Sequence, residues 1–166
     1  MDRSEYQKER FQWKELLEIV HHLRQPDGCS WDRAQTYESM LKCVQDETQE
    51  VVDAVNREDV INLREELGDL MLQVLMYSEI ASEREDFTLD DVIDELAKKL
   101  IRRHPHVFAD EPPAQTKEEG QKRWKEIKLI EKEQKLQEYE KWYQDGRIKK
   151  ELLDRKREMF ERLKKQ

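Results

Sequence analysis

Apolar residues recur at helical intervals along most of the chain, and no segment shows the two-residue alternation typical of a β-strand. Predicted helices run over about residues 4–23, 37–56, 60–84 and 88–103, and from 117 onward with a break at 144–146. Pro26 and Gly28 interrupt the pattern before the second of these helices. Thr88, followed three residues later by Asp91, is typical of a helix cap. The pattern therefore predicts an all-α fold.

The predicted helix at 37–56 mixes carboxylates into its apolar face. At about 100° per residue, one broad face of this helix holds Met40, Leu41, Val44, Val51, Val52, Ala54 and Val55. Glu47 points into that arc, and Glu50 falls about 40° beyond its edge. An unpaired carboxylate is costly to bury, so acids in such positions must be paired, protonated or bound to a metal.

The predicted helix at 60–84 has the same feature. It is apolar over most of its circumference, so we expect it to be buried. Its one polar strip holds Glu66, Asp69 and Gln73. This helix therefore also directs carboxylates toward the protein interior.

The two acidic helices are joined by a short polar stretch, and we expect them to form an antiparallel hairpin with its turn centred near residue 58. Glu50 then lies at the level of Glu66, and Glu47 at the level of Asp69. Within each helix the two acids are three residues apart, which places them on one face. Four carboxylates at one place predict a site for a hard divalent cation. Mg²⁺ fits because it takes oxygen ligands and completes its shell with water and substrate phosphates.

Two other interpretations of these acids are possible. Acidic faces are common on solvated helices, and Lys42, Arg57 or Arg64 could pair with part of the group. A di-iron or di-manganese bundle would use Glu-x-x-His pairs, but neither acidic helix contains a histidine. The matched spacing of two acid pairs about one turn favours the divalent-cation site.

Charge and composition narrow the class of protein. Residues 1–120 hold 15 Lys and Arg against 29 Asp and Glu, a net charge of −14, and residues 121–166 hold 16 against 10, a net charge of +6. The acidic body argues against nucleic acid as a partner, and the alternating signs in the basic tail are typical of a solvated helix. No apolar run is long enough for a membrane span, and the first residues lack the apolar core of a signal peptide. With Cys29 and Cys43 as the two cysteines, we expect a cytoplasmic protein with free thiols.

Several motifs occur together in a fixed order: LRQPDGCSWDRAQT, DETQEVVDAV, LREELGDLMLQVLMYSEIA, KKLIRRHPHVFADE and RWKEIKLIEK. Over about residues 10–133 these segments strongly resemble the MazG nucleotide pyrophosphohydrolases. The resemblance implies an all-α helical bundle in residues 1–133, completed by dimerisation, and leaves residues 134–166 as a charged helical extension. It implies hydrolysis of NTPs and dNTPs between the α and β phosphates to a nucleoside monophosphate and pyrophosphate, as house-cleaning of the nucleotide pool. The implied cofactor is Mg²⁺, with Mn²⁺ as a substitute.

The family's metal signature is ExxE followed, after a spacer, by ExxD. It matches the four acids found above from spacing, and the resemblance implies that they are the metal ligands and the catalytic residues: Glu47, Glu50, Glu66 and Asp69. Two positions depart from the family's pattern. Asp46 stands where the family usually has the first of two consecutive Glu, and Ser30 stands where it usually has Pro.

A triphosphate also needs cations around it. Lys99 and Arg103 lie four residues apart on one predicted helix face, and the resemblance implies that they contact phosphates together with Lys128. Trp124, four residues before Lys128, belongs to the same implied binding group. Trp31 either stacks on the base or shapes the pocket, or it anchors its loop in the core.

Other interpretations of function stay open at this point. One is a sibling activity on the same scaffold, such as dUTP/dCTP or phosphoribosyl-ATP hydrolysis, and another is a non-catalytic nucleotide sensor or interaction module. His104 and His106 are expected to cap a helix end and pack rather than bind metal. The apolar surface of the helices at 37–56 and 60–84 exceeds what the remaining helices can cover, which predicts a homo-oligomer, most simply a dimer.

Overall fold

The computed structural model describes residues 7–164, and every regular element in this range is a helix. The helices are α1 (Trp13–Leu23), α2 (Ser30–Arg33), α3 (Leu41–Asn56), α4 (Val60–Glu83), α5 (Leu89–Arg103), α6 (Pro105–Phe108), α7 (Lys117–Gln144) and α8 (Lys150–Lys164). The all-α fold class predicted from the sequence is confirmed. Each of these helices is too short or too polar to cross a lipid bilayer.

Two predicted helix starts are wrong, because hydrogen bonds to side chains hold the chain in a non-helical conformation just before each helix. The first helix begins at Trp13, where the backbone N–H of Gln12 donates to the Glu15 carboxylate at 3.0 Å. Residues 7–12 are therefore not helical, and residues 4–6 lie outside the described residues. Residues 37–40 form a turn rather than the start of α3. In the turn, the backbone N–H of Thr36 donates to Ser39 Oγ at 2.9 Å, and that of Ser39 to Thr36 Oγ1 at 3.2 Å.

The other predicted boundaries agree closely with the structure. Thr88 caps α5, because its Oγ1 accepts from the Asp91 backbone N–H at 3.3 Å. In return, the backbone N–H and the hydroxyl of Thr88 donate to the Asp91 carboxylate at 2.8 and 2.7 Å. The predicted break at 144–146 separates α7 from α8, and Gly146 there has a φ of 70°, a conformation that favours glycine. Two segments predicted as loops contain the single-turn helices α2 and α6.

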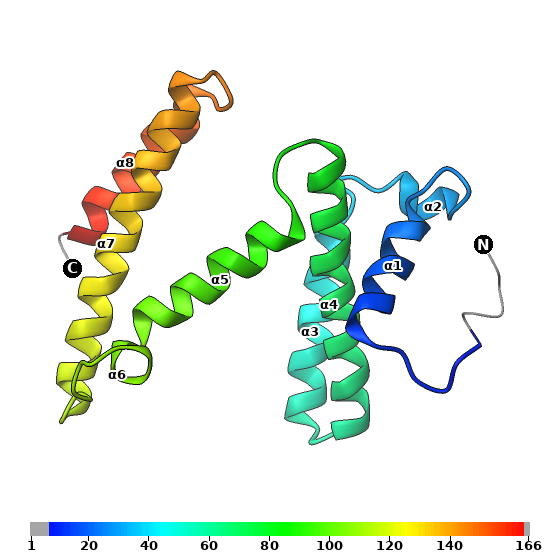
Figure 1. Cartoon of the computed structure of the whole chain (residues 1–166), viewed down its shortest axis with the longest axis horizontal. Coiled ribbons are helices and arrows are strands. Elements are labelled where there is room, and N and C mark those ends of the chain that lie inside the picture. Colours follow the sequence, from blue (N-terminus) through cyan, green and yellow to red (C-terminus); the bar gives the residue numbers. More distant parts are fainter. Residues whose placement is uncertain (1–6, 165–166) are drawn as a thin grey trace. The chain divides into compact units, whose positions relative to one another are not determined.

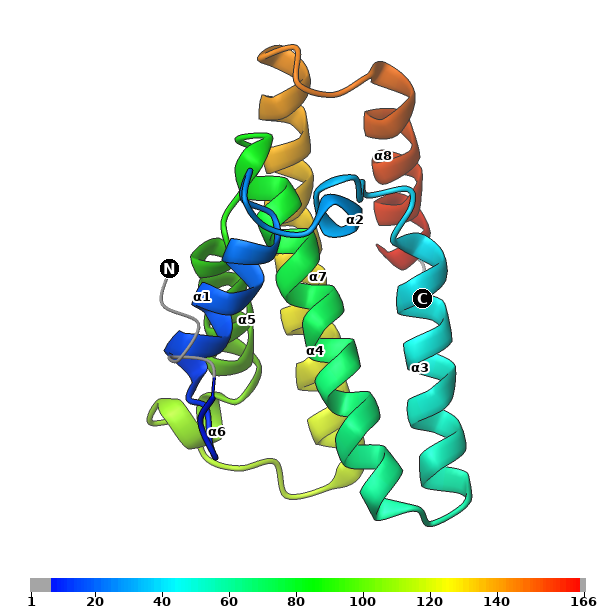
Figure 2. The ribbon, with the colours of Figure 1, turned by 90° about the vertical axis from the view of Figure 1, so that its right-hand side faces the viewer.

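The chain divides into two compact units, residues 1–94 and 95–166, and the division falls within α5. In the first unit, α3 and α4 form an antiparallel hairpin and α1 packs along α4 (Figures 1 and 2). The buried core of this unit consists of Val20, Met40, Leu75, Met76 and Ile80, with Leu16, Leu17, Tyr37, Leu72, Tyr77 and Leu89 packed against it. The hairpin turns at Glu58, whose φ of 57° reverses the chain, and the Asp59 carboxylate then caps α4 by accepting from the Asn62 backbone N–H at 3.0 Å.

In the second unit, α7 and α8 form a helical hairpin (Figure 1). Leu153 and Phe160 of α8 are buried, and Arg157 forms an ion pair with Glu140 of α7 at 2.9 Å. The Lys135 ammonium of α7 lies 3.4 Å from the Glu95 carboxylate of α5. The boundary that the resemblance places at 133/134 falls inside α7, which is one continuous helix.

The burial of α4 differs from the sequence expectation. Its buried residues include the polar side chains of Glu66 and Gln73, each 5% exposed. The apolar side chains of Leu67, Met71 and Val74 are 49%, 43% and 46% exposed. The helix is therefore not covered on all sides, because within the first unit its contacts are made mainly with α3 and α1. The polar strip faces inward and one apolar flank faces outward.

Candidate functional site

Three acids of the α3–α4 hairpin converge on one point. Glu47 of α3 and Glu66 and Asp69 of α4 each offer a carboxylate oxygen, and these oxygens lie within 4.8 Å of one another. The arrangement follows from the hairpin register, which brings the level of Glu47 to that of Asp69, and from the three-residue spacing of the two acids on α4. We call these three residues the acidic cluster.

Glu66 is the most deeply buried member of the acidic cluster. Its residue is 5% exposed, and its Oε2 atom is buried with no hydrogen-bond partner among the described residues. Burial raises the pKa of this carboxyl, and so do the charge and hydrogen bond of Glu50 and the charge of Asp69. An acceptor left unsatisfied in this way is costly, so the position suits a bound cation or a shared proton.

Glu47 experiences the same environment from the opposite helix. Burial raises the pKa of its carboxyl, followed by the negative charges of Asp69, Glu50 and Asp46. Glu50 itself is exposed and lies outside the group of three, although its charge acts on both Glu47 and Glu66. The four predicted acids are thus neighbours, with three in the cluster and Glu50 at its edge.

Two of the cations suggested as neutralisers pair with other acids. Lys42 pairs with Asp46 at 2.5 Å, and Arg57 pairs with Asp53 at 3.3 Å. Within residues 7–164, no ion pair involves any of the four acids. An all-oxygen donor set, uncompensated charge and the unsatisfied Oε2 of Glu66 together fit a hard divalent cation such as Mg²⁺ or Mn²⁺.

Gln73 continues the polar strip of α4 one turn beyond Asp69. It is 5% exposed, and its Oε1 atom is buried without a hydrogen-bond partner among the described residues. The inward side of the hairpin therefore stays polar for two turns of α4, from Glu66 to Gln73. Such a run is unusual for a helix side packed against another helix, because buried polar groups are normally satisfied.

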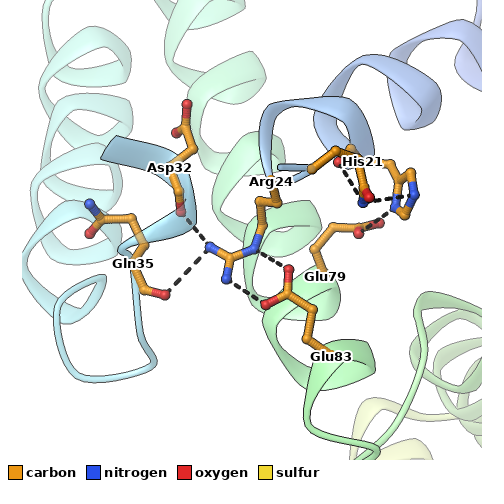
Figure 3. A network of polar contacts seen from close by, with 7 residues as sticks. His21, Arg24, Asp32, Gln35, Glu79 and Glu83 are labelled. Atoms are coloured by element: carbon orange, nitrogen blue, oxygen red, sulfur yellow. Dashed lines mark hydrogen bonds and ion pairs between the residues drawn. The ribbon is translucent and has the colours of Figure 1, made fainter. Parts of the chain in front are cut away.

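Trp31 is 61% exposed on α2, so the alternative in which it anchors its loop in the core is excluded. A different residue, Arg24, holds the loop (Figure 3). The Arg24 side chain is 3% exposed, and its Nε and Nη2 atoms donate to the two carboxylate oxygens of Glu83 on α4, each at 2.7 Å. Its Nη1 atom donates to the backbone carbonyls of Asp32 at 2.5 Å and Gln35 at 3.4 Å.

This network fixes the segment that carries Trp31 to the C-terminal end of α4. One turn before Glu83 on the same helix, Glu79 contacts the His21 ring at 2.9 Å, which links α1 to α4 a second time (Figure 3). Sequence reasoning missed Arg24, because its main partner lies 59 residues away and no local spacing connects them.

In the second unit, two predicted phosphate contacts meet at one aromatic ring. The Arg103 guanidinium carbon lies 5.5 Å from the centre of the Trp124 ring, and the Lys128 ammonium lies 4.7 Å from it. These distances are within the range of cation–π attraction. Trp124 is 44% exposed, so the ring and its two cations form a surface feature.

Arg103 is held in place by a residue that sequence reasoning missed. Its Nη2 and Nε atoms donate to Glu131 Oε2 at 2.7 and 3.1 Å, and Arg102 donates to Glu131 Oε1 at 3.3 Å. Burial acts to raise the pKa of Glu131, but its hydrogen bonds and ion pairs with the two arginines outweigh this and lower it. Glu131 therefore stays charged and orients Arg103. Lys99 is half-buried on α5, one turn before Arg103.

The predicted site residues thus fall into two groups. The four acids and Trp31 belong to the first unit, and Lys99, Arg103, Trp124 and Lys128 belong to the second. His104 is the N-cap residue of α6, and its Nδ1 lies 2.7 Å from the backbone carbonyl of Leu100, so the capping role is as expected. His104 and His106 are both exposed, so the expected packing is wrong.

Comparison with known proteins relates this geometry to a family. The family model described as the MazG nucleotide pyrophosphohydrolase domain matches residues 35–108, which include all four acids. The chain is 45% identical over 123 residues to the nucleoside triphosphate pyrophosphohydrolase/pyrophosphatase MazG of Thermotoga maritima, and 46% identical over 123 residues to the nucleoside triphosphate pyrophosphohydrolase of Escherichia coli K12. Each match covers 74% of this chain and 46% of the relative, so the chain spans about half the length of these curated relatives.

A solved structure gives the same result for the fold. The crystal structure of a mazG-related protein from Thermotoga maritima superposes with a TM-score of 0.58 and 34% sequence identity, over 69% of this chain and 97% of that one. The matching family model, the sequence relatives and the solved structure agree, and the chain belongs to the MazG nucleotide pyrophosphohydrolase family.

Proposed function

We propose that this protein hydrolyses nucleoside triphosphates, both NTPs and dNTPs, between the α and β phosphates and releases a nucleoside monophosphate and pyrophosphate. The observation that carries the proposal is the buried, unsatisfied carboxylate of Glu66 within the acidic cluster of a MazG-family chain. Such a cluster has the ligands for a divalent cation, and it has no positive partner within residues 7–164. Its position within the family match supports a role in the family's reaction.

Glu47, Glu66 and Asp69 would hold the divalent cation, and Glu50 at the edge of the cluster would complete or adjust the site. We propose Mg²⁺ as the cation, with Mn²⁺ as a substitute. When bound, such a cation supplies charge stabilisation for the phosphates and lowers the pKa of a coordinated water. A carboxylate of the cluster would take the proton of the attacking water.

Lys99, Arg103 and Lys128 would bind the phosphates. Arg103 keeps donors for this task, because a guanidinium has five N–H donors and Glu131 engages only its Nε and Nη2 atoms. Trp124 and Trp31, both exposed aromatic side chains, would contact the nucleoside. The pyrophosphate formed would leave as a charged group neutralised by the same cations.

We further propose that the protein works as a homodimer. The outward flank of α4 presents Leu67, Met71 and Val74, and near the hairpin turn Val60 and Ile61 are 73% and 71% exposed. Patches of this kind on a helix mark interaction surfaces. A two-fold partner would cover the flank with an identical one.

A second candidate, a nucleotide sensor without activity, is favoured by one observation. Asp46, at the position where the resemblance expects Glu, points to Lys42 at 2.5 Å and is half of a surface ion pair. A binding module would retain the metal and the nucleotide but release no product. Sibling activities on dUTP, dCTP or phosphoribosyl-ATP would differ only in substrate.

The deciding experiment incubates the purified chain with a panel of NTPs, dNTPs and phosphoribosyl-ATP in Mg²⁺ and separates the products. The expected products are the monophosphate and pyrophosphate, and EDTA should abolish their formation. A nucleoside diphosphate as primary product would rule out the proposed cleavage position. Nucleotide binding without any product would support the sensor.

A further inference from the structure

Gln73 of α4 is a buried amide whose carbonyl oxygen has no hydrogen-bond donor. The residue is 5% exposed, and its Oε1 atom accepts no hydrogen bond from the described residues. Ser78, which is also buried on α4, shows the usual arrangement, because its hydroxyl donates to the Val74 backbone carbonyl at 2.9 Å. An unsatisfied buried acceptor lowers the stability of a fold, so the position indicates that the donor arrives with a ligand.

The side chains around Gln73 do not supply this donor. In the antiparallel α3–α4 hairpin (Figure 2), Glu47 converges with Asp69. Four residues back along α3 and four residues onward along α4, Cys43 comes level with Gln73. The free Cys43 thiol is a weak donor and forms no hydrogen bond with the Gln73 carbonyl. One turn further along α4, the Tyr77 hydroxyl is already used, because it donates to a backbone carbonyl of the turn before α3 at 3.1 Å.

The position of Gln73 relates its unsatisfied acceptor to the acidic cluster. Gln73 follows Asp69 by four residues, so the two side chains share one face of α4, about 6 Å apart along its axis. Side chains on a helix lean toward its N-terminus, which directs the amide of Gln73 back toward the turn of Asp69. The apolar flank of α4 faces outward, so a partner chain covering that flank would not reach this amide.

A cation held by the acidic cluster would bring the missing donor in its water shell. Mg²⁺ takes an octahedral set of ligands at about 2.0–2.1 Å and keeps several waters among them. The charge of the cation makes the O–H groups of these waters stronger donors. With a hydrogen bond of about 2.8 Å added to the metal–oxygen distance, an acceptor about 5 Å from the cation meets such a water. A neutral amide does not take up the proton, in contrast to a carboxylate, so its part is to hold and orient the water.

We propose that Gln73 is a positioning residue, which accepts a hydrogen bond from a water bound to the cation of the acidic cluster and so fixes the orientation of that water for the reaction. The inference rests on the proposed function, because it takes the cluster to hold a divalent cation. It adds a neutral residue to the four acids of the site. It also accounts for the polar strip of α4 that continues past Asp69 into buried surroundings.

The test compares two substitutions of Gln73 with a control on the same helix. Gln73→Met keeps the length of the side chain and removes the acceptor, whereas Gln73→Glu keeps an acceptor at the same place and adds a charge. Ser78→Ala is the control, because Ser78 is 4% exposed but already hydrogen-bonded. The thermal midpoint in EDTA should rise in Gln73→Met, where an apolar group replaces an unsatisfied acceptor. It should fall in Gln73→Glu, where another carboxylate joins the like charges.

Two readouts of cation binding do not depend on activity. Calorimetry gives the Kd for Mg²⁺, and oxygen-17 relaxation gives the exchange rate of water bound to Mn²⁺ in the same site. Gln73→Met should raise the Kd by about tenfold, as for the loss of a group that supports a metal site, and should speed the exchange by about fivefold, as for one lost hydrogen bond. Gln73→Glu should raise neither quantity, and Ser78→Ala should keep both within about twofold of the wild type. With ATP at saturating Mg²⁺, kcat of Gln73→Met should fall at least about tenfold while KM stays within about twofold.

The outcomes separate the inference from the proposed function. If the wild type releases pyrophosphate but Gln73→Met has the Kd, the water exchange and the kcat of the wild type, the role of Gln73 is wrong and the activity stands. Equal losses in Gln73→Met and Ser78→Ala would overturn it as well, because the effect would then be structural. An additional Mn²⁺-bound water in Gln73→Met would show Gln73 to be a direct ligand instead. If the wild type binds both cations without turning over any triphosphate, the proposed activity fails, while the Kd and the water exchange still decide the role of Gln73.

Discussion

Glu47 of α3 and Asp69 of α4 face each other across the hairpin, with carboxylate oxygens within 4.8 Å. After burial, the charge of Asp69 is the largest cause that raises the pKa of Glu47. Two like charges held together by the packing of two helices oppose the fold unless a proton or a cation lies between them. This relationship determines how the protein should respond to metal, to pH and to substitution.

Removing one carboxylate of the acidic cluster should abolish activity and increase the stability of the metal-free protein. For Glu66→Gln and Asp69→Asn we expect the loss of kcat/KM to exceed about a hundredfold, since losing even a residue that supports a metal ligand typically costs ten- to a hundredfold. The thermal midpoint in EDTA should rise in both variants, because like-charge repulsion is relieved. Activity assays and thermal unfolding measure the two effects.

Mg²⁺ provides a readout for the same variants that does not depend on activity. At a hundred times its Kd, a ligand specific for the folded state adds about 2.7 kcal/mol to the free energy of unfolding. The wild type should show such a gain in Mg²⁺, and the two variants should not. Asp53→Asn on the same helix is the control, because Asp53 pairs with Arg57 and lies outside the cluster. An undiminished Mg²⁺ response in Asp69→Asn would contradict the metal assignment.

The stability of the metal-free protein should depend on pH through Glu47 and Glu66. Both have a folded-state pKa raised above the ordinary value of 4.5, so the folded state binds more protons than the unfolded state in the window above that value. The free energy of unfolding contributed by these groups therefore falls as pH rises from about 4.5 through the raised pKa values. Urea unfolding in EDTA between pH 4 and pH 8 should show a less negative slope for Glu66→Gln than for the wild type.

Breaking the Arg24 network should destabilise the first unit and release the segment that carries Trp31. Arg24→Ala leaves the partly exposed Glu83 without its bidentate partner and two backbone carbonyls without a donor. We expect a loss of about 2–4 kcal/mol in the free energy of unfolding, between the cost of an unsatisfied buried polar group and that of a broken buried ion pair. Arg57→Ala, which removes an exposed pair on α3, should cost less than about 0.5 kcal/mol.

Limited proteolysis provides the second measurement for Arg24. Cleavage between residues 26 and 36 should become faster in Arg24→Ala, because the guanidinium no longer holds the carbonyls of Asp32 and Gln35. Arg24→Lys should be cleaved at a rate between those of the wild type and Arg24→Ala, since an ammonium cannot reproduce the planar fork of hydrogen bonds. Equal cleavage of wild type and Arg24→Ala would show that other contacts hold this segment.

The orientation of Arg103 by Glu131 should be visible in substrate affinity. Arg103→Ala should weaken triphosphate binding by about 1–3 kcal/mol, as for a lost charge-assisted hydrogen bond. Glu131→Gln keeps the shape of the side chain but loses its charge, so Arg103 should be held less firmly over Trp124, and KM should rise by a smaller factor. Glu138→Gln, on the same helix, is the control. A KM unchanged in both Arg103→Ala and Glu131→Gln would remove Arg103 from the phosphate contacts.

The helices and the acidic cluster could be predicted from the sequence, because both depend on local spacing. The turn near Glu58 sets the hairpin register, and that register alone brings Glu47 level with Asp69. The spacing also placed Glu50 beyond the edge of the apolar face of its helix, and the residue is exposed, but its position outside the group of three could not be predicted in the same way. It depends on the rotation of α3 about its own axis, which only packing determines.

The remaining differences have the same origin in contacts that are distant along the chain. Trp31 is exposed because Arg24, rather than the indole ring, attaches its loop to α4, and the partners Arg24 and Glu83 are 59 residues apart. Arg103 is oriented by Glu131, 28 residues away. A pattern of apolar and polar positions contains no information on such pairs, since it describes one helix at a time.

The outward flank of α4 should determine the oligomeric state. Leu67, Met71 and Val74 lie on one face at intervals of four and three residues, and all three are more than two-fifths exposed. Leaving such a stripe in water forgoes the stabilisation that burial of apolar side chains provides, about 25 cal/mol for each square ångström.

A two-fold interface would bury each stripe against its copy, so we expect sedimentation at low micromolar concentration to give twice the 20.3 kDa mass of one chain. Met71→Glu should shift the protein toward the monomer, because the dimer could form only by desolvating two new like charges, one carboxylate from each chain, at the interface. Leu152→Glu, an exposed apolar residue of α8, is the control and should leave the mass unchanged. Sedimentation of the wild type as a monomer would show that the flank is solvent-exposed in the working protein.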